Sequence, residues 1–131
     1  MTIAIDTNIL VRLLAEDDQE QLKLVHRLIK RHNENGALFI SVIVLLELYW
    51  VLQKCYQWSD QNICAALEDI LRARQFYVEN DLAVKMAVSR CRKNQDFSDA
   101  LIGQIGACRN LKTYTFDKAL KNDHAFVLLE N

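Results

Sequence analysis

The chain has 131 residues, a formal net charge of −1 at pH 7, no proline and three glycines. This length predicts a single domain over residues 1–131 with a core of its own. Hydrophobic residues make up 51% and charged residues 25%, as in ordinary globular domains. The charge balance excludes a basic surface over the whole molecule, so nucleic acid would have to meet local positive charge or bound metal ions. The scarcity of glycine and proline predicts a helix-rich fold.

Several features predict a cytoplasmic protein that does not enter a membrane. The amino terminus has no basic segment and no apolar run long enough for a signal peptide. The longest apolar stretch, Val42–Leu52, contains Glu47 and is shorter than the roughly 20 residues that cross a bilayer. The four cysteines form no C-x-x-C pair, so we expect small buried thiols in a reducing compartment rather than a zinc site. They are Cys55, Cys64, Cys91 and Cys108.

Strands and helices are predicted to alternate in the first half of the chain, because short apolar runs are followed by capping residues and by apolar residues at a 3.6 period. The predicted elements are a strand at Thr2–Ile5, a helix at Ile9–Leu14, a helix that begins after Asp17 or Asp18 and ends at Asn35-Gly36, a strand at Ala37–Ile40, and a helix from Val42 to about Lys54 with Ser41 as its cap.

The second half repeats this alternation. The predicted elements are a helix from Ser59 to about Arg72, a strand at Phe76–Val78, a helix from Asn80 or Asp81 to about Arg92, a helix from Ser98 to about Arg109, a strand at Lys112–Thr115, a helical turn capped by Asp117 over Lys118–Lys121, and a strand at Ala125–Leu129. Such alternation predicts an α/β fold with a mostly parallel sheet of about five strands and helices on both faces.

Four acidic residues lie where folding alone does not explain a charge. Asp6 and Asp117 follow predicted strands, and ligands of parallel sheets bind at the carboxyl ends of strands. A carboxylate beside a core is costly unless a cation or hydrogen bonds compensate it. Asp6, Asp99 and Asp117 could each instead cap a helix, with Asp96-Phe97-Ser98-Asp99 as a capping-box variant. Glu47 cannot cap, and we expect few faces of its apolar helix to reach solvent.

Carboxylates without accompanying histidine or cysteine favour Mg²⁺ or Mn²⁺ over zinc. We expect His26, His32 and His124 to lie at the surface or at helix ends, with no catalytic role. Metal ions held by carboxylates suit phosphodiester hydrolysis, because one ion can activate water and a second can stabilise the leaving oxygen.

The order of these motifs resembles that of PIN domains, and most closely that of VapC-type toxins of bacterial toxin–antitoxin pairs. The resemblance spans nearly the whole chain. It implies a five-stranded parallel α/β/α sandwich with Mg²⁺- or Mn²⁺-dependent endoribonuclease activity, which leaves 5′-phosphate and 3′-hydroxyl ends. The matching segments are Asp6-Thr7-Asn8, Leu46-Glu47-Leu48, Asp96-Phe97-Ser98-Asp99-Ala100-Leu101 and Thr115-Phe116-Asp117.

By this resemblance, the catalytic and metal-binding acids are Asp6, Glu47, Asp99 and Asp117. Asp96 matches a second-rank acid, and Thr7, Asn8 and Thr115 would support the site through hydrogen bonds. The resemblance also implies an RNA substrate, a homodimer and a cognate VapB-like antitoxin. The antitoxin would bind some of six apolar residues, and those that it does not bind would belong to the core. These residues are Leu10, Leu13, Leu14, Tyr49, Trp50 and Tyr56.

Two other classes of function stay open. A non-catalytic PIN-type module would bind RNA or a partner without cleaving, and a metal-dependent phosphatase would use similar acids.

Gly103-Gln104-Ile105-Gly106 lacks the context of a phosphate loop and is expected to permit close helix packing. Arg12 would reach substrate or partner, or else pair with a surface acid. Other cations would contact phosphates or complement helix dipoles: Arg72, Arg74, Arg90, Arg92, Lys93, Lys118 and Lys121.

Overall fold

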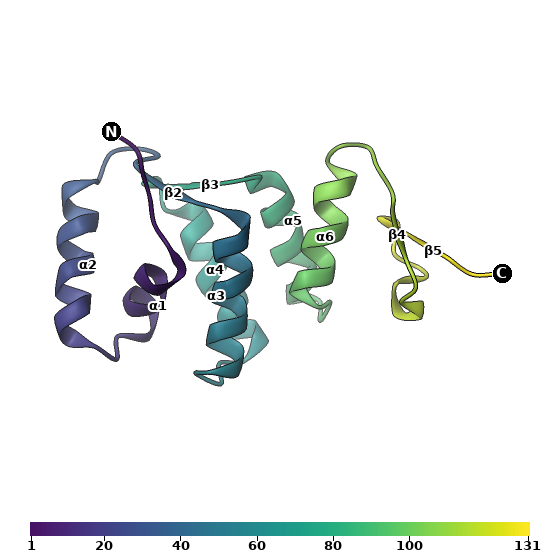
Figure 1. The fold of residues 1–131 in the computed structure, drawn as a ribbon, viewed down its shortest axis with the longest axis horizontal. Helices are drawn as coiled ribbons and strands as arrows, with labels where there is room; N and C mark the ends of the chain where they lie inside the picture. The colour runs from purple at the N-terminus through teal and green to yellow at the C-terminus, as the bar shows by residue number, and fades with distance from the viewer. The chain divides into compact units, whose positions relative to one another are not determined.

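The computed structural model describes residues 1–131. Its chain divides into two compact units, Met1–Asp81 and Leu82–Asn131. The prediction of a single domain over the whole chain stays a prediction. In chain order, the elements are β1 (Ile3–Ala4), α1 (Thr7–Ala15), α2 (Gln19–Arg31), β2 (Leu38–Ile40), α3 (Val42–Lys54), α4 (Asp60–Arg72), β3 (Phe76–Val78), α5 (Asp81–Arg92), α6 (Phe97–Ala107), β4 (Thr113–Thr115), the 3₁₀ helix η1 (Lys118–Leu120) and β5 (Phe126–Leu128). Figure 1 labels all of them except β1 and η1.

The first unit contains a three-stranded parallel sheet in the order β1-β2-β3. Leu38 of the central strand pairs with both Ile3 and Phe76. Parallel neighbours require long crossovers, and two helices supply each of them: α1 and α2 between β1 and β2, then α3 and α4 between β2 and β3. Parallel strands that alternate with helices confirm the predicted α/β class.

Side-chain caps fix where the helices of the first unit begin. Asp18, Ser41 and Ser59 each accept a hydrogen bond from the backbone N–H three residues later, at 3.0 to 3.2 Å. Such caps satisfy one of the free N–H groups of the first turn. As a result α3 and α4 begin where their caps predict.

The end of α2 was predicted too late. The helix ends at Arg31, and the backbone N–H of His32 closes its last turn on the carbonyls of Leu28 and Ile29. Gly36 does lie in the left-handed region, with φ of 70°, but it belongs to the following loop. Its N–H donates to the carbonyl of Arg74 at 2.8 Å. The glycine therefore serves the loop before β2 instead of the helix end.

The core of the first unit joins the sheet to α1, α3 and α4. Burying each large aliphatic side chain contributes about 1.5 to 3 kcal/mol. Contact between the helices and the central strand therefore holds this unit together. The large aliphatic side chains of this unit with no exposed area are Leu10, Leu38, Ile40, Leu45, Leu48, Leu52 and Ile63.

The second unit contains α5, α6, η1 and a two-stranded parallel sheet. Thr113 of β4 pairs with Phe126 of β5, and the register continues to Thr115 and Leu128. All five predicted strands are present and their pairings are parallel, but they form sheets of three and two strands instead of one. Leu120, Ala125 and Phe126 form a small buried cluster with Ala107 packed against it.

Two glycines allow α6 to pack closely within the second unit, as the sequence predicted. A Cβ atom on Gly103 would lie 2.7 Å from Cε2 of Phe126 and 3.1 Å from Cβ of Ala125. One on Gly106 would lie 2.8 Å from the hydroxyl oxygen of Thr113. These distances are shorter than van der Waals contact, so α6 reaches β4 and β5 only where the side chain is absent.

All four cysteines are free thiols. Cys64 and Cys91 are buried as expected, but Cys55 and Cys108 are exposed. The expectation was wrong for these two because each forms the C-terminal cap of its helix, after the last packed turn.

None of the helices combines the length and the apolar character needed to cross a membrane.

Candidate metal centre

Asp6 lies directly after β1 and caps α1. One of its carboxylate oxygens accepts a hydrogen bond from the N–H of Ile9 at 3.3 Å, and its side chain is exposed. The neighbouring Thr7 is 5% exposed, whereas Asn8 is exposed. The capping role considered for Asp6 is therefore real. A carboxylate has about four lone-pair positions, so the cap leaves Asp6 able to bind a cation as well.

Glu47 lies on an exposed face of α3, so the expectation that little of this helix reaches solvent was wrong. Ile43, one turn earlier, is 75% exposed, and Trp50, one turn later, is 57% exposed. Residues at this spacing share one face of a helix. Leu45 and Leu48 are buried on another face. Burial therefore does not support a metal-binding role for Glu47. The support for that role is the position of Glu47 in the motif.

Three further candidate acids lie in the second unit. Asp96 caps α6 by accepting a hydrogen bond from the N–H of Asp99 at 3.0 Å. Asp117 caps η1, accepting from the N–H of Ala119 at 2.9 Å. The N–H of Asp117 in turn donates to the hydroxyl oxygen of Thr115 at 3.0 Å. The predicted supporting role of Thr115 thus has an observed contact, since its hydroxyl holds the backbone at Asp117.

The electrostatics of Asp99 link these three acids. Asp99 is half-buried in the first turn of α6. Burial raises its pKa above the ordinary value, and the carboxylates of Asp96 and Asp117 raise it further. Both causes disfavour the charged form. An ion that carried positive charge to Asp99 would relieve this repulsion.

The donor set fits a hard divalent cation. All five candidate acids offer only carboxylate oxygens, which Mg²⁺ and Mn²⁺ prefer. None of the five forms an ion pair with a lysine or arginine. Neither unit by itself brings three or more such side chains close enough together to hold an ion. The candidates are Asp6 and Glu47 in the first unit, and Asp96, Asp99 and Asp117 in the second.

The raised pKa of Asp99 predicts that Asp99→Asn stabilises the metal-free protein at neutral pH. As the pH rises, the unfolded chain ionises at about 3.9, before the folded protein does. Stability is therefore lost as the pH rises from that value through the higher pKa of the folded state. Asparagine carries no charge and escapes this loss. We expect the variant's advantage in the free energy of unfolding to be absent below about pH 3 and complete at neutral pH.

Urea unfolding of parent and variant in EDTA, at several pH values, measures this advantage. An advantage of equal size at every pH would show that the carboxylate of Asp99 is not under charge repulsion.

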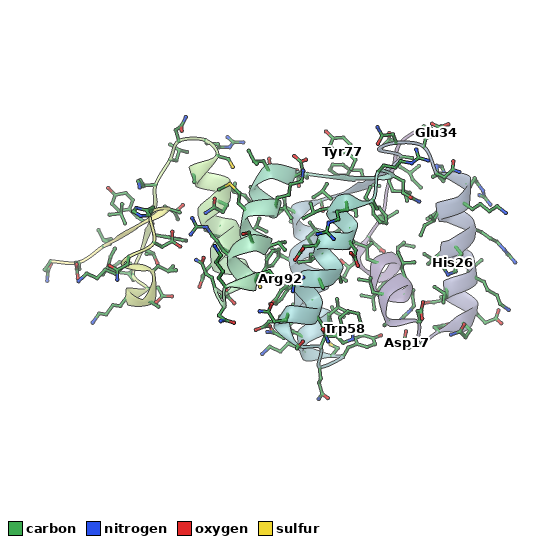
Figure 2. The ribbon with its side chains drawn as sticks, turned by 180° about the vertical axis from the view of Figure 1, so that it is seen from behind. Asp17, His26, Glu34, Trp58, Tyr77 and Arg92 are labelled. Atoms are coloured by element: carbon green, nitrogen blue, oxygen red, sulfur yellow. The ribbon has the colours of Figure 1, made fainter.

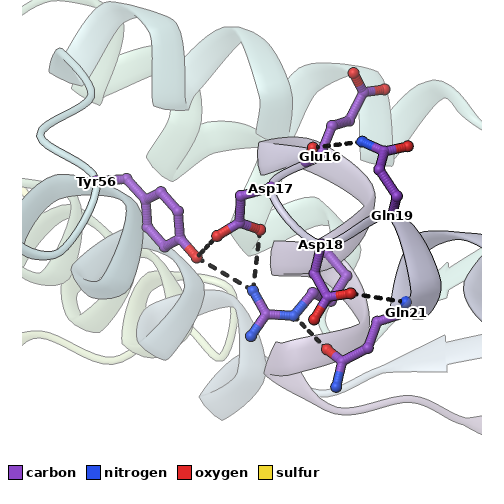
Figure 3. A network of polar contacts seen from close by, with 7 residues as sticks. Glu16, Asp17, Asp18, Gln19, Gln21 and Tyr56 are labelled. Carbon is purple, nitrogen blue, oxygen red and sulfur yellow. Dashed lines mark hydrogen bonds and ion pairs between the residues drawn. The ribbon is translucent and has the colours of Figure 1, made fainter.

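Arg12 pairs with a surface acid, which was one of its two predicted roles. Its guanidinium lies 3.1 Å from Asp17 and donates to the hydroxyl of Tyr56 at 3.2 Å, while that hydroxyl donates to Asp17 at 2.7 Å (Figure 3). Arg12 also donates to the side chain of Gln21. The hydrogen bond from Tyr56 is the largest cause that lowers the pKa of Asp17, and Arg12 adds to it. This network ties α1 to the start of α2 and to the residues after α3.

A cavity of about 430 Å³ lies between α1 and α2 and reaches Asp6. Asn8, Ile9 and Arg12 line it from α1, and Leu24 is among its residues from α2.

The apolar residues that were considered for antitoxin binding differ in exposure. Leu10 and Tyr49 are buried, so they belong to the core, whereas Trp50 is exposed; the others are half-buried: Leu13, Leu14 and Tyr56.

The remaining polar candidates divide by their contacts. His26 projects from α2 and is exposed (Figure 2), His124 is exposed, and His32 caps α2, as predicted. Arg72 pairs with Glu68 at 3.3 Å, which favours its structural role. Arg90 likewise pairs with Asp123 at 3.4 Å. Lys118 and Lys121 are exposed and form no ion pair.

Comparison with known protein families gives a match over residues 3–123 to the PIN domain. The chain belongs to the PIN domain family. Among curated proteins, a VapC ribonuclease from Aquifex aeolicus (strain VF5) is 27% identical over 99 residues, which cover 74% of this chain and 73% of that protein. No solved structure matched.

Proposed function

We propose that this protein is a Mg²⁺- or Mn²⁺-dependent endoribonuclease and the toxin of a VapBC-type toxin–antitoxin pair. The observation that carries the proposal is a PIN-family chain that keeps all four motif acids, each without a cationic partner. The relative named VapC ribonuclease supports the same activity. By the same relationship, we propose a VapB-like antitoxin and a homodimer as its assemblies.

The proposed metal ligands are Asp6, Glu47, Asp99 and Asp117, with Asp96 of second rank. When bound, Mg²⁺ or Mn²⁺ would lower the pKa of water and offset negative charge on the scissile phosphate. The chain's own residues place the carboxylates. Asp6 and Asp117 are held by the caps that they form, and Thr115 fixes the backbone at Asp117. Thr7 and Asn8 lie beside Asp6 and would complete its hydrogen bonds.

The test is cleavage of total cellular RNA by purified protein freed of any partner, in Mg²⁺, Mn²⁺ or EDTA. We expect discrete fragments with either metal, no fragments in EDTA, and recovery when metal is restored. Folded protein that binds RNA but never cleaves it would favour the non-catalytic module. Turnover of a chromogenic phosphomonoester without RNA cleavage would favour the phosphatase.

A further inference from the structure

Charge is unevenly divided between the two units. Residues 82–131 contain eight lysines and arginines against five aspartates and glutamates, whereas residues 1–81 contain eight against twelve. A chain with a net charge of −1 has no general attraction for a polyanion. Positive charge that attracts RNA must therefore be local, and the second unit carries it.

Four of the five acids in the second unit either are candidate metal ligands or accept hydrogen bonds from side chains of this unit. Asp96, Asp99 and Asp117 are the three candidate metal ligands of this unit. Asp123 accepts hydrogen bonds from Arg90 at 3.4 Å and from Gln95 at 2.8 Å. Only Glu130, near the end of the chain, remains. Glu130 follows β5 at the end of the sheet where Asp117 follows β4, but it forms no ion pair with a lysine or arginine.

Lys118 is the first residue of the 3₁₀ helix η1, and Lys121 caps its end. Asp117 caps this turn, and the N–H of Lys121 donates to the carbonyl of Lys118 at 3.2 Å. Leu120, between the two lysines, is 7% exposed and packs in the buried cluster with Phe126. The backbone that carries the lysines is thus fixed relative to Asp117, while both side chains are exposed and without an ion pair.

We propose that Lys118 and Lys121 bind RNA phosphates next to the bond that is cut. Lysine is a flexible point charge that suits phosphate oxygens. The metal-free acids repel a polyanion, and two cations within four residues of Asp117 oppose that repulsion where the substrate must approach. This inference rests on the proposed ribonuclease function, because it assigns the lysines to that function's substrate.

The test measures RNA binding separately from cleavage. A fluorescent single-stranded RNA is titrated with Asp6→Asn protein in Mg²⁺, over a series of salt concentrations. Lys118→Ala and Lys121→Ala are added singly and together, and Lys23→Ala is the control, since Lys23 is an exposed lysine of α2 without an ion pair. We expect each substitution to weaken binding about fivefold near 0.1 M salt and to reduce the slope of log affinity against log salt by about 0.7.

The outcomes separate this inference from the function on which it rests. If the Asp6→Asn protein binds RNA and the Lys118 and Lys121 variants bind it equally well, the lysine assignment is overturned while the ribonuclease proposal stands. An equal loss in Lys23→Ala would also overturn the assignment, because it would show general attraction by charge. If Asp6→Asn and parent protein bind no RNA at all, both proposals fail together.

Discussion

Asp6→Asn should lower kcat/KM for RNA cleavage by about a hundredfold or more. Metal ions supply several kcal/mol to reactions of this type, and each 1.36 kcal/mol corresponds to about a factor of ten in rate. Asparagine keeps an oxygen that accepts the hydrogen bond from Ile9, and it is as good a helix cap as aspartate. The substitution therefore removes the charge without removing the start of α1.

Asp18→Asn is the matched control. Asp18 caps α2 in the same way, with a 3.0 Å hydrogen bond from the N–H of Gln21, and it has no proposed role in the site. We expect its cleavage rate to stay close to that of the parent. If Asp6→Asn cleaves as fast as Asp18→Asn, then Asp6 serves only as a cap, and the metal role assigned to it is wrong.

Gly103→Leu is expected to cost about 2 to 3 kcal/mol of stability, which is the upper part of the range for overpacked cores. The first added atom would already lie 2.7 Å from the ring of Phe126 and 3.1 Å from Cβ of Ala125. Gly103→Ala should cost less, because alanine adds only this first atom and none of the further volume of leucine, while it also recovers up to about 1 kcal/mol of helix propensity. Urea unfolding midpoints measure both effects.

The control for this substitution is Ile102→Leu at the neighbouring position of α6. Ile102 is 49% exposed, so exchanging one aliphatic side chain for another should change stability by less than about 0.5 kcal/mol. Unchanged stability in Gly103→Leu would show that α6 does not pack on β5 as closely as the structure has it.

Local signals predicted the elements of the fold well, because caps and apolar runs act over a few residues. Ser41 and Ser59 fixed the starts of α3 and α4, and Phe76–Val78 was predicted to the residue. The end of α2 was missed because Gly36 has the left-handed backbone of a helix end but uses it in the next loop. The division into sheets of three and two strands has no local signal at all.

The candidate site was predictable as a set of motif residues but not in its environment. Few faces of the helix around Glu47 were expected to reach solvent, yet Ile43 and Trp50 on the same face as Glu47 are exposed. A helix that is apolar all round does not reveal which of its faces is covered. The pairing of Arg12 with a surface acid was predicted, but its hydrogen bond to Tyr56 was missed for a related reason, since Tyr56 is 44 residues away in sequence. Contacts of that kind depend on the packing of α1 against its neighbours.

We propose that acids far apart in the sequence, Asp6 and Asp117 among them, bind the catalytic metal ions. Mn²⁺ binding, followed by electron paramagnetic resonance, tests it most directly in the parent, Asp6→Asn and Asp117→Asn, with Asp18→Asn as control. We predict that the parent and Asp18→Asn bind Mn²⁺ alike and that each of the other two variants binds it at least about tenfold more weakly. Undiminished Mn²⁺ binding by both Asp6→Asn and Asp117→Asn would contradict the claim.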